Sequence, residues 1–321
     1  MRLIFSNRSS ATAIAFASAV WLLISAASSH ADKAPRFAYQ EAAYAIDSRI
    51  AGKSKETDWM VYTEVPHVFS EDGNPWKRSS NCWAADLDLT GVSPFNDPEP
   101  YGHGFGMAQA VTVISPWHVI GSSHSFPKVG EYLVLVDKNN KVINPKPVIV
   151  ASKHFKASAT VYPDISIALL DSPLPDSITP VKVLPDNWKV YFNNLSGIPL
   201  LGFDIHERAI VTEIGAFDYE HEPGIFRNFM QAPSDRQRRE FYKEVEANDS
   251  ANPVFLVLDN QLVLINLMSS GGPGAGTSLV RQKQQINKVM KELFDEHYPE
   301  RVGTSPTLTE LDISSIYTPV R

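Results

Sequence analysis

Short apolar and β-branched runs dominate the hydrophobic pattern of the chain from residue 81 onward. Pro, Gly, Asn and Asp separate these runs, and such residues favour turns. We therefore expect strands at residues 82–89, 108–114, 131–136, 146–151, 165–170, 182–184, 198–203, 209–214, 253–258 and 261–268. Many short strands without helices between them are typical of an all-β sandwich or barrel.

Helical patterns flank this strand-rich region. Residues 37–53 are dominated by Ala, Glu, Gln and Ile, with no Pro or Gly before Gly52, which predicts a helix. Residues 278–297 place apolar side chains at helical spacing and predict a second helix. Residues 59–69 predict an edge strand interrupted by a proline. The Ser/Thr/Pro-rich residues 299–321 are expected to form a loose tail.

The first 31 residues have the pattern of a secretory signal peptide. Arg2 and Arg8 precede an apolar run at residues 11–27, and small residues follow at Ser29 and Ala31. We expect cleavage after Ala31 and a secreted or periplasmic protein. The alternative is an uncleaved membrane anchor, for which the run is somewhat short. No later apolar run is long enough to span a bilayer, so no stable membrane insertion is expected after cleavage.

Charge and cysteine content narrow the function classes. The 321 residues include 29 Lys and Arg against 36 Asp and Glu, a net charge of −7, which becomes −9 without residues 1–31. An acidic chain is not expected to bind nucleic acid through a broad basic face. The single cysteine, Cys82, rules out an intramolecular disulfide framework and is expected to be a small buried hydrophobe. The length suggests about two domains, and nothing in the sequence indicates the oligomeric state.

Three local sequences carry residues suited to nucleophilic catalysis. His118 ends a β-rich run, Asp164 precedes an apolar strand, and Ser250 lies in a small-residue turn before another strand. A serine hydroxyl needs an adjacent base to become a useful nucleophile, and a carboxylate can hold the imidazole in one tautomer. The order His, Asp, Ser therefore predicts a base, an orienting acid and a nucleophile.

At these residues the chain resembles the trypsin/chymotrypsin-like serine peptidases, in particular their disulfide-poor bacterial secreted members. The Thr-Ala-Ala-His segment of the family corresponds to residues 115–118, its Asp-Ile-Ala-Leu-Leu segment to residues 164–170, and its Gly-Asp-Ser-Gly-Gly-Pro segment to residues 248–253. The resemblance covers roughly residues 81–297.

That resemblance implies a fold of two antiparallel six-stranded β-barrels with the active site between them. It divides the chain into a signal peptide (1–31), an N-terminal extension with a short helix (32–80), a first barrel (81–185), a second barrel (186–278), a C-terminal helix (279–298) and a tail (299–321). It further implies a secreted endopeptidase that cleaves a peptide or protein substrate through an acyl-enzyme, with no cofactor and no metal.

The resemblance also assigns the oxyanion donors to the backbone N–H groups of Asn248 and Ser250. Three glycines of the family motif are replaced here, by Asn248, Ala251 and Asn252. Glycine tolerates backbone angles that side chains disfavour, so these changes leave a second hypothesis open. Under it the chain is a catalytically inactive, peptidase-like secreted binding domain.

Substrate selection is expected from two further segments. The family's pocket base falls on Glu244, whose carboxylate would favour a Lys or Arg side chain, although residues 240–246 also read as a solvated acidic stretch. Residues 266–272 would form the pocket wall and the edge strand that pairs with substrate. The residues assigned to this wall are Met268, Ser269, Ser270 and Gly271.

The sequence also bears on a possible metal site and on activation by cleavage. His118 and His124 could share a metal ion, but no third ligand stands at a recognisable spacing. Trypsin-like activation inserts a new N-terminus beside the aspartate that precedes the serine, here Asp249. No basic residue followed by an Ile/Val-rich start precedes Cys82, so we expect a site ordered without such cleavage.

Overall fold

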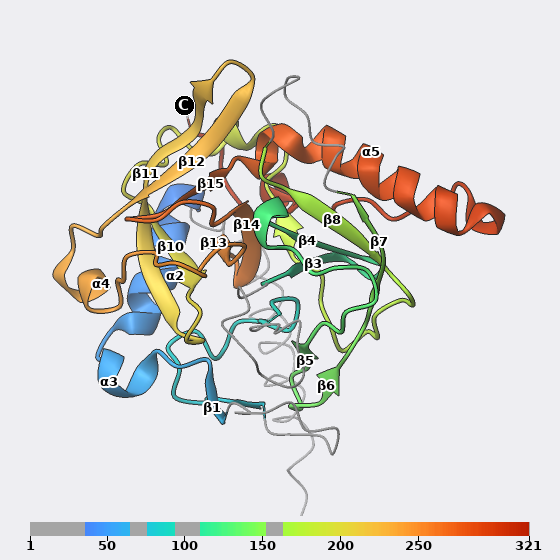
Figure 1. The fold of residues 1–321 in the computed structure, drawn as a ribbon. Coiled ribbons are helices and arrows are strands. Elements are labelled where there is room, and N and C mark those ends of the chain that lie inside the picture. Colours follow the sequence, from blue (N-terminus) through green and yellow to red (C-terminus); the bar gives the residue numbers. More distant parts are fainter. Residues whose placement is uncertain (1–35, 65–75, 94–109, 152–162, 321) are drawn as a thin grey trace, which may run out of the picture. The chain divides into compact units, whose positions relative to one another are not determined.

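Strands make up most of the regular structure in the computed structural model, which describes residues 36–64, 76–93, 110–151 and 163–320 (Figure 1). The proposed signal peptide, at residues 1–31, lies outside the described residues. Four α-helices are described, together with short 3₁₀ turns. The predominance of strands confirms the all-β class.

The larger sheet has seven strands in the order β15-β12-β11-β10-β13-β14-β9. Its strands are β9 (Lys182–Val183), β10 (Pro199–Phe203), β11 (Ala209–Glu222), β12 (Ile225–Gln231), β13 (Pro253–Leu258), β14 (Gln261–Leu267) and β15 (Ala275–Thr277). All neighbours pair antiparallel except β14 with β9, which is parallel. Every residue of β13 is buried, as expected for a central strand covered on both faces.

The smaller sheet has the order β3-β4-β8-β7 and is antiparallel throughout. Its strands are β3 (Thr112–Ser115), β4 (His118–Gly121), β7 (Pro147–Ala151) and β8 (Ser166–Leu170). Two further pairs stand apart, β5 (Leu135–Val136) with β6 (Val142–Ile143), and β1 (Tyr62–Glu64) with β2 (Lys77–Arg78). Within the described residues, neither main sheet is closed on itself, because β15 and β9 end one and β3 and β7 end the other.

The described residues of the N-terminal extension, 36–64 and 76–80, pack into the core. Helix α2 (Ala38–Ile50) buries the Ala- and Ile-rich side of its surface against β10 and β13. Arg238, in α4 (Arg236–Glu240), forms an ion pair with Asp47 of α2 and another with the buried Glu213. The short helix α3 (Lys55–Asp58) follows α2 in the sequence. After it, the Val61 N–H donates to the carbonyl of Glu207, and the Trp59 carbonyl accepts from the N–H of Ala209. The described residues of the extension thus contribute to the hydrophobic core.

The C-terminal helix α5 (Leu279–His297) lies along the smaller sheet at β7 and β8 (Figure 1). Its bounds agree with the helix expected at residues 278–297, because buried side chains recur every three or four residues. Trp117, in the turn between β3 and β4, stacks edge-on against Phe294 and Tyr298, with ring centroids 5.5 and 5.0 Å away. This turn is therefore a docking point for the helix.

Residues 299–320 are docked, contrary to the expected loose tail. Leu308, Leu311, Ile313 and Tyr317 are buried, and the backbone N–H of Leu311 donates to the carbonyl of Val183. The apolar side chains scattered among the Ser, Thr and Pro residues supply enough burial to hold this segment.

A second correction concerns residues 82–89, which form turns rather than the expected strand. The Cys82 carbonyl accepts from Ala85 and the Ala84 carbonyl from Leu87, so the backbone closes on itself locally. Cys82 is buried as expected, and burial raises the pKa of its thiol to about 11. Strands β12 and β15 were not anticipated from the sequence.

Candidate active site

Three side chains from separate segments form one hydrogen-bonded chain. His124 Nδ1 lies 2.5 Å from Asp164 Oδ2, and His124 Nε2 lies 2.8 Å from Ser250 Oγ. The second carboxylate oxygen of Asp164 accepts the backbone N–H of His124 at 3.1 Å. An ionised Asp164 has hydrogen-bond acceptors and no donor. With Asp164 in that form, Nδ1 donates to it and Nε2 is left to accept from the serine hydroxyl. This is the arrangement of an acid, a base and a nucleophile.

The loop that carries His124 is fixed by its serines. It is a single 3₁₀ turn, η2 (Ser123–Ser125), directly after β4. Ser122 Oγ donates to the carbonyl of Met268 at 3.0 Å, and Ser123 Oγ donates to the carbonyl of Ile165 at 2.5 Å. These bonds tie the loop to the segments next to Ser250 and Asp164, so the three functional side chains are held in register.

His118 does not belong to this constellation, so its prediction as the base is wrong. Its side chain is fully buried in β4, and Nδ1 lies 2.8 Å from Ser115 Oγ. The centroid of its ring lies 6.4 Å from that of Phe294 in α5. Burial lowers the pKa of His118 to about 4, an effect that the Met290 backbone opposes. A buried imidazole facing the C-terminal helix cannot reach the serine hydroxyl.

The error comes from a hairpin that the hydrophobic pattern does not reveal. Residues 112–120 read as one β run ending at a histidine, but the chain turns at Pro116 and Trp117 and returns as β4. His118 therefore begins a strand instead of following one. The informative signal was Ser122-Ser123-His124, a histidine preceded by two small residues at a true strand end.

Asp164 and Ser250 lie where the sequence predicted, just before strands. Asp164 precedes β8, and Ser250 precedes β13 in a turn. Both side chains contact His124, and neither contacts His118, the histidine that the sequence predicted as the base. The side chain of His124 is 46% exposed and that of Asp164 is 27% exposed, so the constellation is open to solvent on the histidine side.

The turn that contains Ser250 has, at two positions, a backbone conformation that glycine favours. Asn248 has φ of 78° and Ala251 has φ of 71°, both in the left-handed region. Asparagine tolerates this region better than most residues, whereas for alanine it is strained. Neither the N–H of Asn248 nor that of Ser250 donates a hydrogen bond within the described residues, so both remain available as oxyanion donors.

Asp249 anchors this turn from inside. Its carboxylate is buried and accepts the backbone N–H groups of Glu246 at 2.7 Å and Ile205 at 2.8 Å. Burial raises the pKa of Asp249, and these two hydrogen bonds oppose that effect. Backbone donors from the chain itself thus occupy the carboxylate that would receive a new N-terminus in the resembling family.

The predicted pocket segments lie side by side, but not as expected at the base. The Val245 N–H donates to the carbonyl of Gly272 at 2.7 Å, and this bond joins the segment that carries Glu244 to the predicted pocket wall. Glu244 is exposed, so its carboxylate does not form the bottom of a closed pocket. Met268 is buried, and its sulfur would lie 2.8 Å from a Cβ placed on Gly274.

The rest of this wall runs beside the reacting groups. The Met268 carbonyl accepts both the Ala251 N–H and the Ser122 hydroxyl. Ser269 and Ser270 follow it, and both hydroxyls accept from Arg227 on β12, a residue that the sequence reading did not single out. Gly271 comes next, where an added Cβ would meet only the Val245 carbonyl at 3.5 Å.

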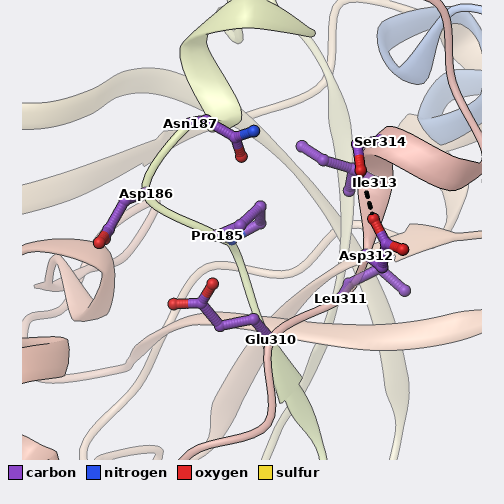
Figure 2. Close-up of a pocket in the computed structure, with 8 residues that line it drawn as sticks. All are labelled: Pro185, Asp186, Asn187, Glu310, Leu311, Asp312, Ile313 and Ser314. Carbon is purple, nitrogen blue, oxygen red and sulfur yellow. Dashed lines mark hydrogen bonds between the residues drawn. The ribbon is translucent and has the colours of Figure 1, made fainter.

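A surface cavity of about 420 Å³ lies elsewhere, between residues 185–187 and 310–314 (Figure 2). It shares no residue with the His124 constellation. The acidic side chains at its rim, Asp186 and Glu310, both pair with the buried Lys283, which links α5 to the C-terminal segment. These contacts give the cavity a structural explanation.

Other site types gain no support. The described residues contain no group of three or more His, Cys, Asp or Glu side chains placed to hold a metal ion. Among the helices of the described segments, none is long and apolar enough to cross a membrane.

No protein-family model matches the chain, and no curated protein matches it.

Proposed function

We propose that this chain is a secreted serine hydrolase that cleaves peptide bonds. The observation that carries the proposal is the hydrogen-bonded chain from Asp164 through His124 to Ser250. Side chains of these three types are common, but their sequential contact on one solvent-accessible loop cluster is the geometry that activates a serine. The proposal includes the finer fold expected from the sequence, two six-stranded barrels with the site between them.

In the proposed reaction, Ser250 Oγ attacks the scissile carbonyl while its proton passes to His124 Nε2. Asp164 stabilises the imidazolium through Nδ1–H. The carbonyl oxygen becomes an oxyanion that accepts from the N–H groups of Asn248 and Ser250. His124 then gives its proton to the leaving amine, which forms the acyl-enzyme. Water then attacks the ester while His124 takes its proton, and His124 returns that proton to Ser250 Oγ as the acid is released.

Hydrolysis of an unstructured protein and of simple esters tests this proposal. We expect turnover by the mature chain, with loss of at least about a thousandfold in His124→Ala and Ser250→Ala. His118→Gln is the matched control, because it changes a histidine that lies outside the constellation, and it is expected to retain activity. Turnover that is absent in folded wild-type protein would favour the binding-domain hypothesis instead.

A further inference from the structure

Arg227 is a half-buried cation that lacks a carboxylate partner within ion-pair distance among the described residues. It lies on β12, and its Nη2 donates to the hydroxyls of Ser269 at 3.1 Å and Ser270 at 2.5 Å. Its Nε and Nη1 donate no hydrogen bond within the described part of the chain. A guanidinium offers five N–H donors, so most of its hydrogen-bonding capacity is unused.

This arrangement differs from that of other arginines in the same sheet region. Arg208 pairs with Asp204, Arg238 with Glu213, and Arg281 with Asp218. Partly buried charges are normally paired, because removing a charge from water without compensation is costly. A half-buried guanidinium whose hydrogen bonds go only to neutral hydroxyls, and whose Cζ lies 5.6 Å from the centroid of the Phe229 ring, is therefore a candidate for binding an anion.

The pocket-wall segment connects Arg227 to the residues around Ser250. Ser269 and Ser270 directly follow Met268, whose carbonyl accepts from Ala251, the residue after Ser250. The negative charges of Asp164 and of Glu222 on β11 also act on Arg227, where both oppose the lowering of its pKa by burial. Arg227 thus contacts the wall segment that follows Met268, and Asp164 is near enough for its charge to act on the guanidinium.

We propose that Arg227 selects substrates that carry an acidic side chain, Glu or Asp, on the N-terminal side of the scissile bond. This inference rests on the proposed function and names its substrate class. Fork-shaped hydrogen bonding from a guanidinium fits a carboxylate, and the Ser269 and Ser270 hydroxyls can rotate to donate to the same group. The preference is the opposite of the one expected from Glu244, whose exposed carboxylate does not form a pocket base.

The test compares matched peptides that differ only in Glu, Gln or Lys at each of the positions preceding the cleaved bond. For the wild-type chain we expect kcat/KM for Glu at the best position to exceed that for Gln by roughly ten- to hundredfold, as for hydrogen bonds to a charged group. The ratio should fall as salt is raised. In Arg227→Gln it should approach one, and Arg227→Lys should restore part of it.

Arg281→Gln is the matched control, since it removes a guanidinium that already has a carboxylate partner. It should leave the Glu-to-Gln ratio unchanged. If Arg227 only supports the wall, Arg227→Gln will lower turnover of Glu and Gln peptides equally, and the inference is overturned.

A binding measurement separates this inference from the proposed function. Ser250→Ala protein should bind the Glu peptide more tightly than the Gln peptide, and the added Arg227→Gln change should abolish the difference. Wild-type turnover without a Glu preference leaves the hydrolase standing and removes the role of Arg227. Absence of turnover together with equal binding of both peptides rejects both.

Discussion

A histidine can act as a base only if one ring nitrogen is held and the other faces a reacting group. His124 meets both conditions, through Asp164 on one side and Ser250 on the other. His118 meets only the first, because its Nδ1 lies 2.8 Å from Ser115 Oγ while the ring is buried in a strand against the C-terminal helix. Residue type and strand context were predictable from the sequence. Which histidine faces the serine depends on a hairpin turn at Pro116 and Trp117 that apolar patterning does not mark.

The buried His118 should make the fold sensitive to acid. Its pKa of about 4 in the folded chain lies below the ordinary value of 6.5, so the unfolded chain binds the proton first. The contribution of the neutral imidazole is fully present above about pH 6.5 and is lost as pH falls towards 4, by at most about 3 kcal/mol. Urea unfolding at about pH 7 and pH 4.5 should show a smaller loss for His118→Gln than for wild type. Equal losses in the two proteins would contradict this.

The left-handed conformation of Asn248 gives a second prediction at the residue scale. Asn248→Gly should keep hydrolysis within about twofold, because glycine adopts φ of 78° without strain. Asn248→Val should slow hydrolysis by about tenfold or more, because a β-branched residue resists this region and the oxyanion donor shifts. The measurement is kcat/KM on one ester substrate, with secondary structure checked in both variants. A fully active valine variant would argue against the Asn248 N–H as an oxyanion donor.

At the scale of elements, patterns with strong periodicity were predictable and compact loops were not. The helix at residues 279–297 and strand β13 follow from their spacing and apolar content. Residues 82–89 look strand-like but close into turns, because tertiary burial of Trp83 and its bond to the Ala209 carbonyl outweigh local preference. Strand β12, which carries Arg227, mixes polar and aromatic residues without clean alternation, so no pattern indicated it.

Helix α2 supplies a test of whether the N-terminal extension belongs to the working protein. Ile46 is fully buried against the larger sheet, so Ile46→Ala should cost about 2–4 kcal/mol in the free energy of unfolding. Tyr44, on the same helix, is 68% exposed, and Tyr44→Ala should change stability by less than about 0.5 kcal/mol. Denaturant unfolding of the two variants provides the measurement. Equal small effects would indicate that the extension can leave without harm to the fold.

At the scale of the whole molecule, the site depends on three segments that are distant in sequence. The loop after β4, the approach to β8 and the turn before β13 meet because Ser122 and Ser123 tie the first to the other two. The buried Asp249 holds the third with backbone donors alone. The intact chain, without cleavage next to the extension, is therefore expected to hold an ordered site.

The most direct test of the central claim is covalent labelling of the folded mature chain with a serine-directed phosphonate, located by mass spectrometry. We predict a single adduct on Ser250 in wild type and in His118→Gln, and none in His124→Ala. The phosphonate replaces its leaving group with Ser250 Oγ, so labelling reports activation of that hydroxyl. Folded wild-type protein without an adduct on Ser250, or an equal adduct in His124→Ala, would contradict the account.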